Sequence, residues 1–154
     1  VYDFAYDSKG TPYAGSSNGG ATLWKSVFTT YGDGSGQWGT WIAMKNFSST
    51  GIVKGILVDP QNDNRIFVAV AEGVLSVRRI YVTTQANLGT SAKWHDITGS
   101  FPVVGGCTAL AIDYEHGEKG HLLCATNGAG LWKLPLNDSP QALPPGRTCI
   151  GACI

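Results

Sequence analysis

Short apolar runs alternate along the chain with breaks rich in glycine, asparagine and aspartate, and the same order of runs occurs three times. Each repeat opens with an apolar run that ends in aspartate, at Asp7, Asp59 and Asp113, and these positions lie 52 and 54 residues apart. Runs of this length between turn residues are typical of β-strands, and a fixed spacing indicates a repeat architecture. The pattern therefore predicts three similar β units.

Each repeat is expected to contain further strands. The first two runs of a repeat are almost continuously apolar, as expected of strands that are covered on both faces. Trp24 and Trp132 lie in the matching segments Leu23-Trp24-Lys25 and Leu131-Trp132-Lys133, and we expect both to fill the space between neighbouring sheets. Second strands are predicted at residues 12–15, 65–71 and 121–126, third strands at 21–27, 74–82 and 130–134, and tryptophan-containing fourth strands at 38–42 and 94–97.

Four short strands in a repeat of about 50 residues predict an all-β fold of about three four-stranded β-propeller blades. The blades are expected at about residues 1–48, 49–100 and 101–136, followed by a proline-rich linker and cysteine-containing tail at 137–154. Because closed propellers have about four to eight blades, we expect a larger or multi-chain propeller. The remaining blades would come from the same precursor, from other protomers or from a partner subunit.

The third repeat is predicted to stop after its third strand. An exposed strand edge is therefore expected at residues 130–134, and an uncovered blade face at residues 1–7. Residues 148–154 have two interpretations: a fourth strand, paired locally or with a neighbour, or a disulfide-pinned tail on the surface.

Charge and hydropathy exclude two classes of partner. The 11 basic residues balance the 11 acidic ones, so no basic stripe is present for a nucleic acid. No stretch approaches the roughly 18 apolar residues of a membrane helix. We therefore expect neither nucleic acid nor membrane as a partner.

The cysteine count and the glycosylation patterns favour a secreted or extracellular protein. The four cysteines fit two disulfides with three possible pairings. The hairpin predicted in repeat three brings Cys107 opposite Cys124, which leaves Cys149 to pair with Cys153. Acceptor sequences for N-linked glycans begin at two positions in predicted loops, Asn46 and Asn137.

Three segments resemble the blades of the BNR/Asp-box propeller family: Val58-Asp59-Pro60-Gln61-Asn62, Tyr13-Ala14-Gly15 and Gly130-Leu131-Trp132-Lys133. The Asp-box turn itself is degenerate, at Asp33-Gly34-Ser35-Gly36-Gln37-Trp38. The resemblance covers residues 1 to about 136 and implies a propeller like those of sortilin-type receptors, xyloglucan-active glycoside hydrolases and sialidases. In that family the Asp-box is a folding element away from the active site.

Catalytic chemistry has little support in the sequence. The resemblance implies a carboxylate before a Gly-Gly pair in xyloglucan-active enzymes, but Ser16-Ser17-Asn18-Gly19-Gly20 has none. The arginines do not match the triad of sialidases. His116 and His121 share one predicted turn with two glutamates, and a polar hairpin explains them as well as a metal does. We predict no catalytic residue, no metal and no cofactor.

Several polar and aromatic residues remain as candidates for binding. Asp33 is expected to brace its own turn, whereas Asp3 and Asp96 have no evident structural role and are candidates to face a cleft. Aromatic rings stack on sugars, although packing between blades explains the same residues. The ligand-binding candidates are Trp38, Trp41, Tyr31 and Trp94.

The sequence as a whole predicts a secreted β-propeller segment that acts as a binding or assembly module for a carbohydrate or a protein. Part of a secreted glycoside hydrolase acting on β-glucan or xyloglucan is the first alternative. A structural protein that self-assembles through open propeller edges is the second.

Overall fold

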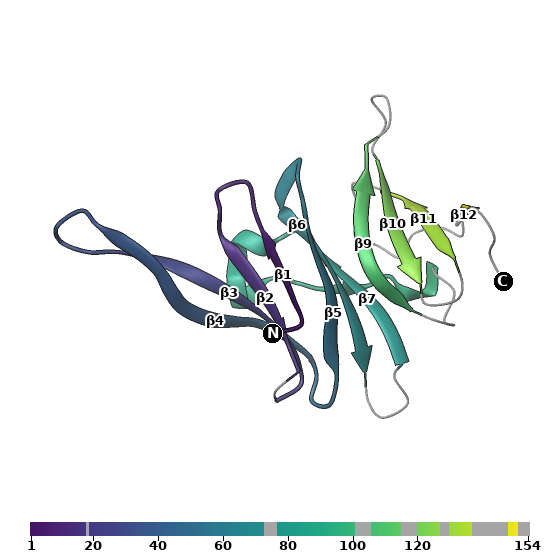
Figure 1. The fold of residues 1–154 in the computed structure, drawn as a ribbon, viewed down its shortest axis with the longest axis horizontal. Helices are drawn as coiled ribbons and strands as arrows, with labels where there is room; N and C mark the ends of the chain where they lie inside the picture. The colour runs from purple at the N-terminus through teal and green to yellow at the C-terminus, as the bar shows by residue number, and fades with distance from the viewer. Residues whose placement is uncertain are drawn as a thin grey trace.

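The computed structural model describes residues 1–17, 19–72, 77–100, 106–114, 120–126 and 130–136, together with the backbone of 148–150. The all-β prediction is confirmed, because these residues form three four-stranded antiparallel sheets. Within each sheet the strands follow one another in chain order. We number the three sheets in chain order, so that sheet 1 contains the N-terminal strands and sheet 3 the C-terminal strands. Figure 1 shows them side by side, with sheet 2 between sheets 1 and 3.

The strands lie close to their predicted positions. Two short 3₁₀ helices, η1 (Ala86–Ser91) and η2 (Thr98–Ser100), flank the last strand of sheet 2. Sheet 1 contains β1 (Asp3–Tyr6), β2 (Pro12–Ser16), β3 (Ala21–Thr30) and β4 (Gly36–Ser48); sheet 2 contains β5 (Ile52–Asp59), β6 (Asn62–Glu72), β7 (Val77–Thr83) and β8 (His95–Asp96); sheet 3 contains β9 (Cys107–Asp113), β10 (His121–Thr126), β11 (Leu131–Pro135) and β12 (Thr148–Ile150).

Sheet 3 corrects one expectation from the sequence. Residues 148–150 form β12, which pairs antiparallel with β11 in the register Leu131↔Ile150. The predicted open edge at residues 130–134 is therefore wrong, because β12 covers it, and the fourth-strand interpretation of the tail holds. Pairing across a long connection leaves no local signal in the sequence, so the repeat seemed to end early.

Strand register defines which residues are equivalent in the three repeats. The central residue of each second strand has one partner on the first strand and one on the third, and such cross-strand partners project from the same face of a sheet. The three sets are Phe4–Ala14–Trp24 in sheet 1, Ile56–Val68–Tyr81 in sheet 2, and Leu110–Cys124–Trp132 in sheet 3.

Strand β6 shows why sheet 2 is stable between its neighbours. Ile66, Val68 and Val70 belong to the core between sheets 1 and 2. The alternate residues Phe67 and Ala69 belong to the core between sheets 2 and 3. Because successive residues point to opposite faces, this continuous apolar run contributes to two cores at once. Burying a side chain of this size adds about 1.5–3 kcal/mol to the free energy of unfolding. The prediction of strands covered on both faces is confirmed for β6.

A disulfide joins the first two strands of sheet 3. Cys107 and Cys124 are bonded across 17 residues of sequence, with their Cα atoms 5.4 Å apart, which confirms the pairing predicted from the hairpin. Both cysteines are buried in the core between sheets 2 and 3. For Cys149 only the backbone in β12 is described, and Cys153 lies outside the described residues, so the second predicted pair stays a prediction.

Two of the aspartates that follow or end the first strands, Asp7 and Asp59, brace the turns that come after them. The backbone amides of Lys9 and Thr11 donate to Asp7 Oδ1 at 2.9 and 2.8 Å. Asp59 accepts from the amide of Gln61 at 2.9 Å in the same way. These side chains replace backbone partners that the turn cannot provide.

Hydrogen bonds at these strand ends also tie one sheet to the next. The Ser8 amide and hydroxyl donate to Asp63 at 2.9 and 2.5 Å, which joins sheet 1 to sheet 2. Arg65 Nη2 lies 2.5 Å from Asp59 Oδ2, and the Tyr114 hydroxyl, just after β9, donates to Asp59 Oδ1. The Asp59 side chain is 0% exposed, so these partners and the Gln61 amide take the place of water around its carboxylate.

The substitution Asp59→Asn is expected to lower the free energy of unfolding by about 3 kcal/mol, because removing one partner of a buried ion pair leaves the other charge unpaired. Urea unfolding at neutral pH measures the change. Asp33→Asn, which alters a carboxylate in an exposed turn, is the matched control and is expected to shift the midpoint far less. Equal shifts for the two variants would contradict the role given to Asp59.

Candidate functional site

The face of sheet 1 that points away from sheet 2 carries four aromatic residues, Phe4, Tyr6, Trp24 and Trp41, which we call the aromatic face. Register places Phe4 and Trp24 on either side of Ala14, on one face. Ala5, between Phe4 and Tyr6, packs instead into the core with sheet 2. Because successive residues of a strand point to opposite faces, the two β1 aromatics point outward.

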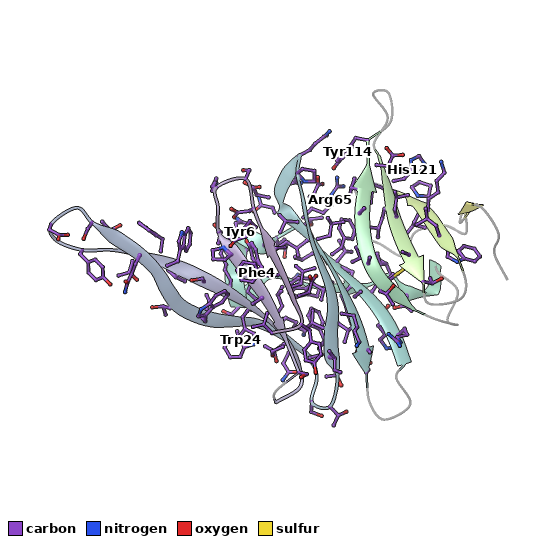
Figure 2. The ribbon with its side chains drawn as sticks, viewed as in Figure 1. Phe4, Tyr6, Trp24, Arg65, Tyr114 and His121 are labelled. Carbon is purple, nitrogen blue, oxygen red and sulfur yellow. A yellow bond between two sulfur atoms is a disulfide. The ribbon has the colours of Figure 1, made fainter. Side chains whose placement is uncertain are left out.

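Contacts within sheet 1 hold these rings in place. Phe4 lies edge-on to Tyr6 at 4.9 Å and to Trp41 at 6.2 Å between ring centroids. Trp24 Nε1 donates to Ser16 Oγ at 3.1 Å. Figure 2 labels Phe4, Tyr6 and Trp24 on sheet 1. A set of rings fixed in this way loses little conformational freedom when it packs against another surface.

The aromatic face remains open to solvent although its residues are large and apolar. Phe4 is 42% exposed, Tyr6 61% and Trp41 42%. A contiguous apolar patch of this kind usually marks an interaction site. The uncovered face predicted at residues 1–7 is therefore confirmed for Phe4 and Tyr6.

The equivalent positions of sheets 2 and 3 are packed between sheets. Ile56 and Tyr81, equivalent to Phe4 and Trp24, pack in the core between sheets 1 and 2. Leu110 and Trp132 pack in the core between sheets 2 and 3. The prediction that a tryptophan fills the space between sheets is confirmed for Trp132. Trp24 occupies the equivalent position on the face of sheet 1 against which no other described sheet packs.

The hairpin of β3 and β4 extends beyond the body of sheet 1 (Figure 1). Its turn is braced by Asp33, which accepts from the Ser35 hydroxyl at 2.6 Å and the Ser35 amide at 2.9 Å. These hydrogen bonds hold the pKa of Asp33 below its ordinary value. The predicted role of Asp33 is confirmed.

An open pocket of about 450 Å³ lies between this hairpin and η1. Phe28 and Trp38 line it as an edge-on pair with ring centroids 5.1 Å apart, opposite Leu88 on η1. Its polar lining residues are Lys25, Asn87, Thr11, Ser26 and Thr90. The described lining contains no aspartate or glutamate, so the carboxylate pair of a glycoside hydrolase is not assembled in this pocket.

The four predicted ligand-binding aromatics do not form one site. Trp38 lines the pocket beside η1, and Trp41 lies on the aromatic face. Tyr31 is 45% exposed in the hairpin turn. Trp94 packs against Phe47 in the core between sheets 1 and 2, which is the packing role that the sequence left open for it.

The two unexplained carboxylates have structural partners. Asp3 accepts a hydrogen bond from the Ile56 amide at 2.5 Å, which ties β1 to β5. Asp96 forms an ion pair with Arg79 Nη1 at 2.6 Å. Burial opposes the charge on Asp96, but hydrogen bonds from Thr98 and Arg79 hold its pKa below the ordinary value. The suggestion that either residue faces a cleft receives no support.

The remaining predicted positions are partly outside the described residues. Asn46 is exposed, but it lies within β4 opposite Thr22 rather than in a loop, which corrects that expectation. Asn137 and His116 fall outside the described residues. In the described part of the chain, no three metal-binding side chains gather. No helix there is long and apolar enough to span a membrane.

Comparison with known proteins identified no relative of this chain. No protein-family model, no curated protein and no solved structure matches the chain. The aromatic face is therefore the feature of the chain that most directly indicates a function. Phe4 and Tyr6 were not predicted as site residues from the sequence. Their alignment with Ile56 and Val58 at the end of the first strand could have indicated that they occupy packing positions.

Trp132 and Trp24 are expected to differ in their contribution to stability. Trp132→Ala removes a side chain packed between two sheets and is expected to cost about 3 kcal/mol. Trp24→Ala removes mainly one hydrogen bond and contacts within sheet 1, and we expect about 1 kcal/mol. Chemical unfolding in dilute solution, where the chain is alone, measures both. A larger cost for Trp24→Ala would contradict the assignment of Trp24 to an uncovered face.

Proposed function

We propose that this chain is a β-propeller segment, of the kind found in BNR/Asp-box proteins, and that it acts as an assembly module. Its aromatic face docks a further β-sheet of the same type. One observation carries the proposal: the aromatic face occupies positions whose equivalents pack between sheets at both internal contacts, through the half-buried Tyr81 in one and Trp132 in the other.

The arrangement of the strands supports a propeller. Each sheet is a four-stranded antiparallel meander. The first strands of successive sheets lie beside one another, β1 next to β5 and β5 next to β9. Sheets that stack face to face with their first strands adjacent are the arrangement of blades around a common axis.

The chemistry of the aromatic face suits sheet packing. Phe, Tyr and Trp side chains each bury about 150–250 Å² in a core or interface. At about 25 cal/mol per Å², covering Phe4, Tyr6 and Trp41 gives several kcal/mol toward association. None of the four defining residues is charged, so these side chains bring no charge into a dry contact.

Of the ligand classes predicted from the sequence, a polypeptide fits this surface better than a carbohydrate. A sugar site needs convergent polar groups beside an aromatic ring, whereas the aromatic face presents rings on a flat sheet. The disulfide between Cys107 and Cys124 is compatible with an oxidising, extracellular compartment. We therefore propose a secreted module whose partner is a β-sheet.

The double variant Phe4→Glu/Tyr6→Glu is expected to abolish self-association, because it places two charges in a contact that would be dry. Sedimentation velocity over a range of concentrations measures particle mass. The matched control is Tyr31→Glu/Trp38→Glu, which alters two aromatics of 45% and 41% exposure away from the aromatic face.

We expect the unmodified chain and the control to associate with rising concentration, and the Phe4/Tyr6 variant to stay monomeric with an unchanged unfolding midpoint. A monomeric unmodified chain at every concentration, or an equal loss in the control, would contradict the proposed function.

A further inference from the structure

Among the described residues, no further sheet packs on the face of sheet 3 that points away from sheet 2. This face carries mainly small and aliphatic side chains, and we call it the outer face of sheet 3. Ala109 and Ala111 are exposed on it. The remaining members are half-buried; register places Leu123, Ala125, Leu131 and the charged Lys133 there.

We propose that the outer face of sheet 3 docks on the aromatic face of a second copy of this chain, and that two copies close into one ring of six sheets. This inference rests on the proposed function. It names the partner, the partner's surface and the number of copies.

Residue equivalence supports the choice of surface. Ala111 is equivalent to Ala5 in sheet 1 and Leu57 in sheet 2, since each is the second residue before the aspartate that ends its strand. Ala5 packs toward sheet 2, and Leu57 packs toward sheet 3. By the same step, Ala111 points toward the sheet that would follow sheet 3.

The same holds on the second strand. Leu123 is paired with Ala111, as Tyr13 is with Ala5 and Phe67 is with Leu57. Tyr13 and Phe67 are each buried against the following sheet. The outer face of sheet 3 therefore corresponds to the faces of sheets 1 and 2 that pack against the next sheet in the chain. The aromatic face corresponds to the faces of sheets 2 and 3 that pack against the previous sheet.

Side-chain size favours joining these two faces. The core between sheets 2 and 3 combines Leu57 and Phe67 on one side with Leu110 and Ile112 on the other. In the proposed junction the side chains on the outer face of sheet 3 are smaller, with Ala111 in place of Leu57. Those on the aromatic face are larger, with aromatic rings at Phe4 and Tyr6. Interiors pack to a nearly constant density, so small residues on one face match large residues on the other.

The number of sheets limits how many copies complete the ring. With β12 in place, one chain supplies three whole four-stranded sheets. Closed propellers have about four to eight blades. Two copies give six sheets, whereas one copy gives too few and three copies too many. Each copy would contribute its aromatic face to one junction and the outer face of sheet 3 to the other, a head-to-tail contact that closes.

A mixing experiment with two variants tests this arrangement. The first variant, Phe4→Glu/Tyr6→Glu, blocks the aromatic face. The second, Ala109→Glu/Ala111→Glu, blocks the outer face of sheet 3, and Ala111→Lys serves in its place if the double variant does not fold. Circular dichroism and thermal unfolding check folding, and analytical ultracentrifugation measures mass.

We expect the unmodified chain to form a two-chain particle. Each variant alone lacks both junctions, and its dissociation constant is expected to rise by about 30-fold or more, as for the loss of an interface hot spot. An equimolar mixture keeps one intact junction, between the aromatic face of the second variant and the sheet 3 face of the first. Two-chain particles with one copy of each variant are therefore expected to return, at higher concentration than for the unmodified chain.

The other outcomes separate the inference from the proposed function. If the Ala109/Ala111 variant alone still forms two-chain particles, the aromatic faces meet each other, and the inference is overturned while docking on that face stands. Long open polymers of the unmodified chain would overturn closure at two copies. A monomeric unmodified chain would overturn the proposed function itself.

Discussion

Every sheet of this protein has two apolar faces, and this requirement for a neighbour on each side organises the molecule. Sheet 2 satisfies it fully, because alternate residues of β6 enter two different cores. In the part of the chain that the structure describes, sheets 1 and 3 have a neighbouring sheet on one side only. The exposed rings of Phe4, Tyr6 and Trp41 are the consequence, since the same repeat pattern that builds the internal cores also places apolar residues on the terminal faces.

Polar contacts at the strand ends set how the sheets meet. Asp59 holds Arg65 and Tyr114 at the contact of sheets 2 and 3, and Asp63 holds Ser8 at the contact of sheets 1 and 2. Apolar packing has little directionality, whereas these hydrogen bonds fix which edges of the sheets lie together. The disulfide between Cys107 and Cys124 adds a covalent link within sheet 3. As a result, each sheet packs on the next in the same way. We therefore predict that the open faces of sheets 1 and 3 pack against a sheet of the same type.

Much of the fold could be predicted from the sequence, because its signals are local. The aspartate that ends each first strand, the apolar run of β6 and the turn at Asp33 all depend on neighbouring residues. The pairing of β12 with β11 could not be predicted in the same way, because it joins segments across a long connection. Predicting the site residues also required knowing on which face of its sheet each aromatic side chain lies. Trp94 and Trp41 look alike in sequence, yet one is packed in a core and the other is open.

Hydroxyl-radical footprinting, read by mass spectrometry in dilute and concentrated solution, tests the central claim most directly. Concentration is predicted to protect Tyr6 and Trp24 on the aromatic face and Leu123 on sheet 3, while Tyr31 in the hairpin turn keeps the same reactivity. Equal labelling of Tyr6, Trp24 and Leu123 at both concentrations would contradict the claim that these faces pack against another copy.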